Sequence, residues 1–169
     1  MAWFASTRRK LATFASLSAG QRWLALAAVA LAPVARLSLA CLGYARTTAM
    51  LRALSKGADR RPRAAEESLA LAREVARAVA AGTRNAPGGA NCLRRSLMLW
   101  WLLRRRRVPA TLHIGVRKPE GDFQAHAWVR VGDTVLNDSR DVAERYAPFA
   151  ELRESAHAAA FPAEGLTRV

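Results

Sequence analysis

The chain has 169 residues, of which 51% are hydrophobic, and this is enough for the core of one ordinary domain. Such a composition excludes a fully disordered chain. Two cysteines, Cys41 and Cys92, are too few for a disulfide framework, and no convincing secretory cleavage site follows an early apolar run. These features predict a protein of the reducing cytoplasm.

The formal net charge of +14 is unevenly distributed. Residues 1–63 hold eleven basic residues against the single acid Asp59, whereas the remainder of the chain carries a net charge of only +4. A basic, apolar N-terminal part suits nucleic acid, an anionic membrane surface or an acidic peptide. Because no nucleic-acid motif is present and aromatic residues are poorly interleaved with basic ones, we expect no nucleic-acid partner.

Residues 1–54 read as a basic helical region without strand alternation. Residues 3–14 form a short basic amphipathic stretch, and Ser18 with Gln21 has the pattern of a capping box. An apolar run over residues 23–32 then meets Pro33, which is expected to kink or end the helix, and Arg36 interrupts its continuation.

This apolar run falls short of the ~18 uninterrupted residues of a membrane-spanning helix. We therefore expect a buried helical hairpin, in which Cys41 packs in the core. Peripheral membrane association of residues 1–54 is the alternative, since a basic helix that carries tryptophan also suits a membrane interface.

Polar residues 55–63 predict a linker, which separates the N-terminal region from a domain over residues 64–169. This domain opens with a helix over residues 64–81, whose apolar residues recur on one face and which Gly82 should end. No internal repeat, phosphate-binding glycine motif or metal-ligand cluster is present, so we expect no cofactor and no metal.

A second helix should begin directly after Asn91, a good N-cap type, with Cys92 as its first residue. The unpaired backbone N–H groups at a helix N-terminus favour a thiolate over a thiol, which is what a nucleophilic cysteine requires. A small buried residue is the alternative interpretation of Cys92, because free cysteine is commonly buried. The run Arg104–Arg107 at the helix end is typical of a solvated C-terminus.

After Pro109 the period changes from 3.6 to 2, which predicts strands over residues 111–118, 123–131 and 134–138. A helix followed by an antiparallel meander indicates an α+β fold. In the second strand one face should point to the core and the other away from it. The core face holds Phe123, Ala125, Ala127, Val129 and Val131, and the other face holds Gln124, His126, Trp128 and Arg130.

His126 therefore lies on a polar or site-facing surface, where a plain surface histidine would also fit. The register of the next hairpin decides which acid it meets. A two-residue loop would pair Ala127 with Asp138, whereas a three-residue loop places Asp138 directly opposite His126. We predict the three-residue loop or an equivalent bulge, with Gly132 in an unusual backbone conformation. His113 is a rival histidine, and His157 is a weaker one.

Cys92, His126 and Asp138 thus make a Cys-His-Asp set for nucleophilic catalysis. The segments that surround these residues, 91–97, 108–116, 125–129 and 136–138, resemble one family closely. The chain resembles the transglutaminase-like cysteine proteases of lasso-peptide biosynthesis, which remove the leader from a ribosomally made precursor.

The resemblance covers about residues 64–145 and implies a papain- or transglutaminase-like core, with a nucleophile helix packed on an antiparallel sheet. It implies that Cys92 is the nucleophile, His126 the general base and Asp138 its orienter, and that His113 lies outside the triad. Gln124 and Trp128 share the face of His126 and are candidates for the substrate wall.

The resemblance also implies partners. Because residues 1–60 show no strands of a fused leader-recognition domain, a separate recognition protein is expected to present the lasso precursor peptide. An ATP-dependent macrolactam cyclase is expected to act beside the peptidase. The alternatives are a transglutaminase-like acyl transferase with the same triad, and a non-enzymatic basic adaptor for membrane or nucleic acid.

Overall fold

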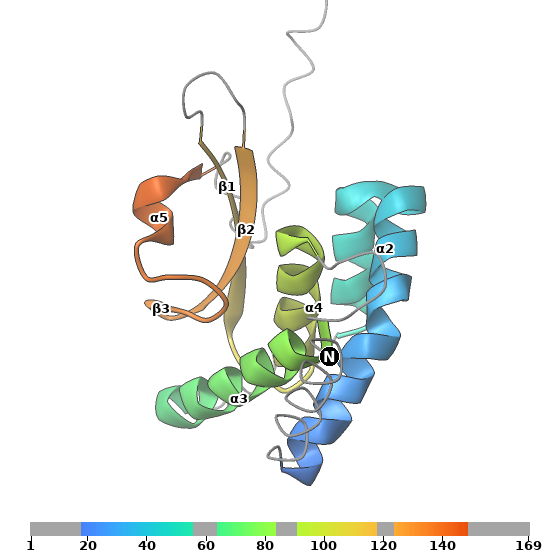
Figure 1. The fold of residues 1–169 in the computed structure, drawn as a ribbon, viewed down its shortest axis with the longest axis vertical. Helices are drawn as coiled ribbons and strands as arrows, with labels where there is room; N and C mark the ends of the chain where they lie inside the picture. The colour runs from blue at the N-terminus through green and yellow to red at the C-terminus, as the bar shows by residue number, and fades with distance from the viewer. Residues whose placement is uncertain (1–17, 56–63, 84–90, 118–123, 149–169) are drawn as a thin grey trace, which may run out of the picture.

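A computed structural model describes residues 18–55, 64–83, 91–117 and 124–148. Three helices pack on one another, and the second and third of them also pack on one face of a small antiparallel sheet (Figure 1). The elements in chain order are α2 (Ala19–Ala53), α3 (Ala65–Thr83), α4 (Cys92–Arg104), β1 (Ala110–Arg117), β2 (Gln124–Val131), β3 (Thr134–Val135), α5 (Val142–Arg145) and β4 (Ala147–Pro148). The fold is therefore α+β, as predicted. The predicted stretch 3–14 lies outside the described residues.

The predicted capping box starts α2. The Ser18 hydroxyl accepts a hydrogen bond from the Gln21 N–H, and the Gln21 side chain accepts one from the Ser18 N–H. The helix does not end at Pro33, and its non-helical residue is Gly43, with φ of +72°. Such a φ suits glycine because it has no Cβ.

Gly43 divides α2 into two segments that fold back on each other as a hairpin (Figure 1). Leu31 and Ala35 of the first segment line the same pocket as Thr47 and Leu51 of the second. The predicted hairpin therefore forms, but only its inner side is buried.

The inner side of α2 carries small residues that permit close packing on α3. Ala25 and Ala28 are almost completely buried, and a Cβ added to Gly82 of α3 would lie 2.4 Å from the Ala25 carbonyl oxygen. Gly82 is thus needed for the close approach of the two helices, and α3 continues through it to Thr83.

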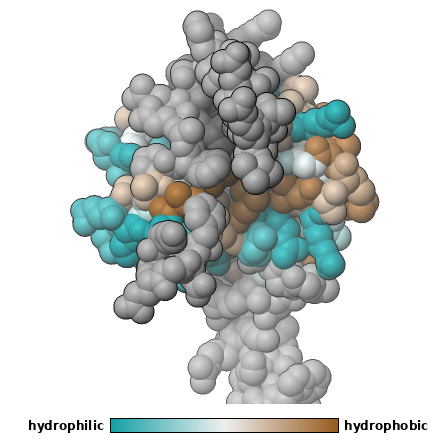
Figure 2. All heavy atoms as spheres, turned by 90° about the horizontal axis from the view of Figure 1, so that it is seen from above, coloured by the Kyte–Doolittle hydropathy of each residue, from teal (hydrophilic) through white to brown (hydrophobic). Residues whose placement is uncertain are grey.

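The outer side of α2 is apolar and exposed. All of the large exposed hydrophobic residues in the described part of the chain lie on α2 or its C-cap: Trp23, Leu26, Val29, Val34, Leu37, Leu42 and Leu54. By length and composition α2 could cross a membrane, although buried core helices pass the same test. Cys41, predicted to be in the core, is exposed. Seen from above, hydrophobic surface crosses the molecule between hydrophilic patches (Figure 2).

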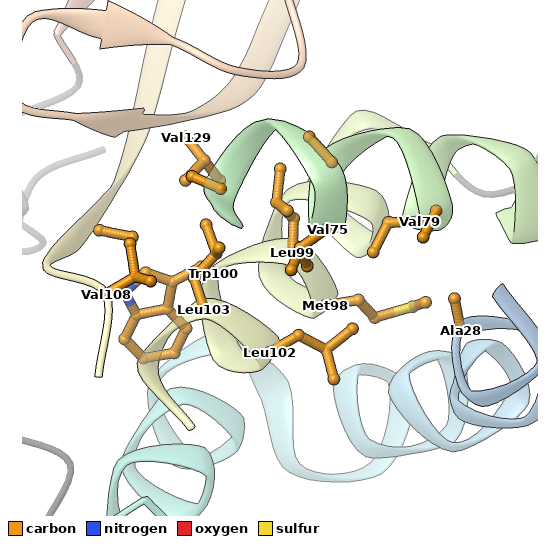
Figure 3. Packing of buried hydrophobic residues seen from close by; sticks show 14 of the residues in the cluster. Ala28, Val75, Val79, Met98, Leu99, Trp100, Leu102, Leu103, Val108 and Val129 are labelled. Atoms are coloured by element: carbon orange, nitrogen blue, oxygen red, sulfur yellow. The ribbon is translucent and has the colours of Figure 1, made fainter. Parts of the chain in front are cut away.

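One hydrophobic core joins the three helices to the sheet. Ala28 of α2, Val75 and Val79 of α3, Leu99 of α4 and Val129 of β2 all belong to it (Figure 3). Helix α4 is buried on most sides, with Leu97, Leu99, Trp100 and Leu103 each at most 1% exposed. The core thus includes residues from both sides of the predicted linker 55–63. The predicted domain boundaries remain a prediction.

The sheet has the strand order β3-β2-β1-β4, and β1 and β2 pair along their full length. Ala127, Val129 and Val131 are buried as predicted, whereas Ala125 is exposed and Phe123 lies outside the described residues. The opposite face holds a second small cluster of Trp128, Val142 and Tyr146. The short strand β4, which pairs with β1, was not predicted.

The predicted three-residue loop between β2 and β3 is wrong. Val131 pairs with Thr134 and Arg130 with Val135, so the loop contains only Gly132 and Asp133. Among the described residues of this loop, Gly132 alone has positive φ, +54°, as the first central residue of a type II′ hairpin requires. Type II′ turns match the right-handed strand twist, and this explains the preference for the shorter loop.

Candidate active site

Cys92 is the first residue of α4, as predicted. The Asn91 side chain caps the helix, since its Oδ1 atom accepts a 2.9 Å hydrogen bond from the Arg94 N–H. The first backbone bond within the helix runs from the Arg95 N–H to the Asn91 carbonyl. Cys92 is a free, partly exposed thiol at the end of the helix where backbone N–H groups can stabilise negative charge.

His126 and Asp138 are in direct contact through His126 Nε2 and Asp138 Oδ2, and both side chains are about four-fifths buried. They meet although the strand register differs from the predicted one. The ladder continues only to the hydrogen bond between the Leu136 N–H and the Val129 carbonyl. Next to it, the Val129 N–H donates to the side chain of Asn137 at 2.8 Å.

Asn137 therefore interrupts the ladder before Asp138. Regular continuation of the observed register would have placed Asp138 opposite Ala127, on the face away from His126. Because the Asn137 side chain bonds the Val129 N–H, the chain leaves the sheet and bends over residues 136–138. This bend carries the Asp138 carboxylate to His126.

The second oxygen of Asp138 is held from the other side. Asp138 Oδ1 accepts hydrogen bonds from the Ser139 N–H at 2.7 Å and from Arg145 Nη2 at 3.1 Å. Burial alone would raise the pKa of Asp138, but the hydrogen bonds from Ser139 and His126 outweigh it and hold that pKa below its ordinary value. Asp138 is thus an ionised carboxylate fixed in one orientation.

Aromatic rings pack around His126. The Tyr146 ring stacks on the imidazole with centroids 5.0 Å apart, and Trp128 lies at 6.2 Å. Gly115 pairs with His126 across the sheet and makes room for this packing, because an added Cβ would lie 2.8 Å from Tyr146 Cβ and 2.9 Å from Trp128 Cη2. The imidazole is therefore confined by its neighbours as well as by Asp138.

The first turns of α4 are tied to the same region by Ser96. Its hydroxyl donates a 2.8 Å hydrogen bond to the carbonyl oxygen of Ala127, the residue after His126. It also accepts a 2.8 Å hydrogen bond from Asn137 Nδ2, next to Asp138. Ser96 is completely buried and lies one helical turn after Cys92, on the same side of α4. No hydrogen bond joins Cys92 to His126 among the described residues.

The two candidates for the substrate wall, Gln124 and Trp128, differ in exposure. Gln124 is exposed and accepts a 2.9 Å hydrogen bond from Arg117 Nε, whereas Trp128 is only 2% exposed and stacks between His113 and His126. His113 thus packs against Trp128. His157 lies outside the described residues, which contain no group of three or more side chains suited to a metal ion.

Sequence patterns do not single out Ser96, Asn137, Tyr146 or Gly115. Ser96 does carry a signal, since it is a small polar residue directly before the apolar run over residues 97–103 of the helix. Such a residue must find hydrogen-bond partners when it is buried.

Comparison with known proteins agrees with this architecture. The family model described as the transglutaminase-like superfamily matches residues 31–151. The chain is also similar to the microcin J25-processing protein McjB of Escherichia coli, with 37% identity over 62 residues. That alignment covers 37% of this chain and 29% of the relative. No solved structure gives a significant match. Since the family match extends over most of the length of the chain, the chain belongs to the transglutaminase-like superfamily.

Proposed function

We propose that the chain is a cysteine peptidase that removes the leader from a ribosomally made lasso-peptide precursor. The contact between His126 and Asp138 is the observation that carries the proposal, because an imidazole oriented by a buried carboxylate is the base of a nucleophilic triad. The resemblance to lasso-peptide leader peptidases and the similarity to a protein named for microcin J25 processing support the same substrate class.

In this mechanism Asp138 accepts a hydrogen bond from Nε2–H of His126, which leaves Nδ1 as the basic nitrogen. Nδ1 takes the thiol proton of Cys92, and the sulfur attacks the carbonyl carbon of the scissile bond. Backbone N–H groups at the start of α4 stabilise the oxyanion that forms. The His126 imidazolium then protonates the leaving amine as the C–N bond breaks.

The acyl-enzyme is hydrolysed by the same residues in reverse roles. His126 Nδ1 removes a proton from water, whose oxygen attacks the thioester carbonyl, and the thiolate of Cys92 leaves as the free leader acid is released. A hydrogen bond between Cys92 and His126 is not required in the resting state, because catalytic hydrogen bonds often tighten only when substrate binds.

The test is precursor cleavage by the purified chain, with the separate recognition protein present. Cys92→Ala should abolish cleavage, whereas Cys41→Ala, at an exposed cysteine on α2, should leave the rate unchanged. Full cleavage by Cys92→Ala would contradict the proposal. Mass spectrometry of the leader fragment decides between hydrolysis and the alternative acyl transfer, since transfer would leave an amine joined to its new carboxyl end.

The partners and location are part of the proposal. A recognition protein would present the leader, and an ATP-dependent macrolactam cyclase would act on the product. The exposed apolar side of α2 would contact a membrane surface peripherally, since it carries the large exposed hydrophobic residues of the described chain. The basic character of residues 1–63 favours anionic lipid in such a contact.

A further inference from the structure

A pocket of about 330 Å³ opens between α3, α4 and the segment that follows β3. Three arginines line it: Arg73 and Arg77 from α3, and Arg95 from α4. Its remaining lining is apolar apart from one amide, and consists of Ala76, Val79, Ala80, Leu99, Leu136 and Asn137. None of the described lining residues is acidic, so three positive charges share one pocket without a counter-charge from the described part of the chain.

These arginines have no partners among the described residues. None of the three takes part in a hydrogen bond or ion pair in the described part of the chain, and the Nε–H of Arg95 is buried without an acceptor. A guanidinium cannot lose its charge, and a buried donor without an acceptor lowers stability. Arg73 and Arg77 also repel each other at the i, i+4 spacing of one helix. An anion in the pocket would relieve all of these costs.

The pocket adjoins the candidate active site through two segments. Arg95 lies three residues after Cys92 on α4, and Asn137 directly precedes Asp138. Asn137 also donates to Ser96, so a ligand in the pocket would touch the hydrogen-bond network that joins α4 to the His126 strand. A peptide bound at Cys92 could therefore place a nearby side chain among the arginines.

We propose that Arg73, Arg77 and Arg95 form a carboxylate-binding subsite that takes an acidic side chain of the peptide substrate. The planar guanidinium of Arg95 matches the two oxygens of a carboxylate, and the more exposed Arg73 and Arg77 close over them. The apolar floor at Val79 and Leu99 would hold the methylene groups of the acidic residue. The identification of the ligand as substrate rests on the proposed peptidase function.

Binding can be measured without catalysis, in the full-length protein with Cys92→Ala. The probe is a fluorescein-labelled peptide with two glutamates, compared by anisotropy with the same peptide carrying glutamines, at 0.15 M salt to screen distant charges. Arg95→Gln should weaken binding of the glutamate peptide at least tenfold. Arg36→Gln, the same change at an exposed site of α2, should alter it less than twofold.

Arg73→Gln with Arg77→Gln provides a second variant, in which both changes are at exposed positions that folding tolerates. It should also weaken binding at least tenfold. Equal losses in the pocket variants and in Arg36→Gln would overturn the subsite in favour of general attraction to a basic chain. Equal binding of the two peptides would overturn it too, and so would displacement of the peptide by inorganic phosphate at concentrations where acetate has no effect, because the pocket would then be a phosphate site.

The subsite and the peptidase function can fail separately. If Cys92→Ala still cleaves precursor but the pocket variants lose the glutamate peptide, the function is wrong and the carboxylate subsite stands. If Cys92→Ala is inactive and the pocket variants bind the glutamate peptide like the parent protein, the subsite is wrong and the function stands.

Discussion

The side-chain amide of Asn137 donates a 2.8 Å hydrogen bond to the hydroxyl of Ser96, which lies 41 residues earlier in the chain. Through Ser96 the bond reaches the carbonyl of Ala127, and through its own oxygen Asn137 holds the Val129 N–H. The helix that begins with Cys92, the strand of His126 and the bend that presents Asp138 are therefore fixed by one polar network. Low-dielectric surroundings strengthen such a network, provided that every member is satisfied.

Removal of the hydroxyl should break this network. In Ser96→Ala, Asn137 Nδ2 and the Ala127 carbonyl each lose a partner in a buried site, and we expect a loss of about 1–3 kcal/mol of folding free energy. We also expect kcat for precursor cleavage to fall by about 10²-fold with little change in KM, because small misplacements of catalytic groups have effects of this size. Urea unfolding and steady-state kinetics would measure the two effects. An unchanged kcat would show that Ser96 only stabilises the fold.

The two roles of Asn137 can be separated by an isosteric change. Asn137→Asp keeps an oxygen for the Val129 N–H but loses the donor to Ser96. Asn137→Ala loses both, so that the Val129 N–H is free to bond the Leu136 carbonyl and extend β3. We expect Asn137→Ala to reduce kcat more than Asn137→Asp, since only the extended strand turns Asp138 away from His126. Equal kcat values in the two variants would contradict the account of the bend.

The depressed pKa of Asp138 predicts a pH-dependent contribution to stability. A carboxyl whose folded pKa lies below its ordinary value of 3.8 stabilises the fold above that value, and this stabilisation is lost as the pH falls through the folded pKa. The difference in unfolding free energy between the parent protein and Asp138→Asn should therefore be constant near neutral pH and shrink below about pH 4. Urea titrations from pH 3 to pH 7 would measure it. A difference that grows on acidification would contradict the assigned direction.

The sequence predicts some features of the candidate site correctly and others incorrectly. The cap of Asn91 on α4 depends on neighbouring residues only, so helix periodicity and cap preference predict it. The contact of His126 with Asp138 was expected from a three-residue loop, but the loop has two residues. Asp138 reaches His126 because the hydrogen bond from the Val129 N–H to the Asn137 side chain ends the ladder before Asp138. A side chain that replaces a backbone acceptor leaves no periodic signal, and alternation alone therefore gives the wrong register.

Sequence patterns also could not predict the contacts that residues 146–148 make. Tyr146 covers His126 and β4 pairs with β1, yet a two-residue strand is too short to show a period. The exposure of the outer side of α2 was missed because a run of apolar residues looks the same whether its helix is buried on one side or on both.

Gly115 should be sensitive to the addition of a single methyl group. In Gly115→Ala the new Cβ would lie within 3.0 Å of Tyr146 Cβ and Trp128 Cη2, so the rings against His126 must shift. We expect a destabilisation of about 1–3 kcal/mol, as for other overpacked sites, and a fall in kcat. Gly20→Ala is the matched control, because its nearest atom would be 4.0 Å away and alanine favours the helix by about 0.5–1 kcal/mol. Thermal unfolding would rank the variants, and a Gly115→Ala protein as stable as its parent would contradict the close packing.

The exposed side of α2 should support binding to anionic vesicles. Trp23 and Leu37 are 72% and 65% exposed, so Trp23→Ser with Leu37→Ser should leave the unfolding temperature almost unchanged. Their removal should reduce co-sedimentation of the full-length chain with phosphatidylglycerol vesicles several-fold, because insertion of apolar side chains adds to the attraction of the basic residues. Phosphatidylcholine vesicles should bind the parent protein weakly. If the variant binds anionic vesicles like its parent but changes from dimer to monomer in light scattering, the apolar side of α2 is an interface between copies of the chain instead of a membrane contact.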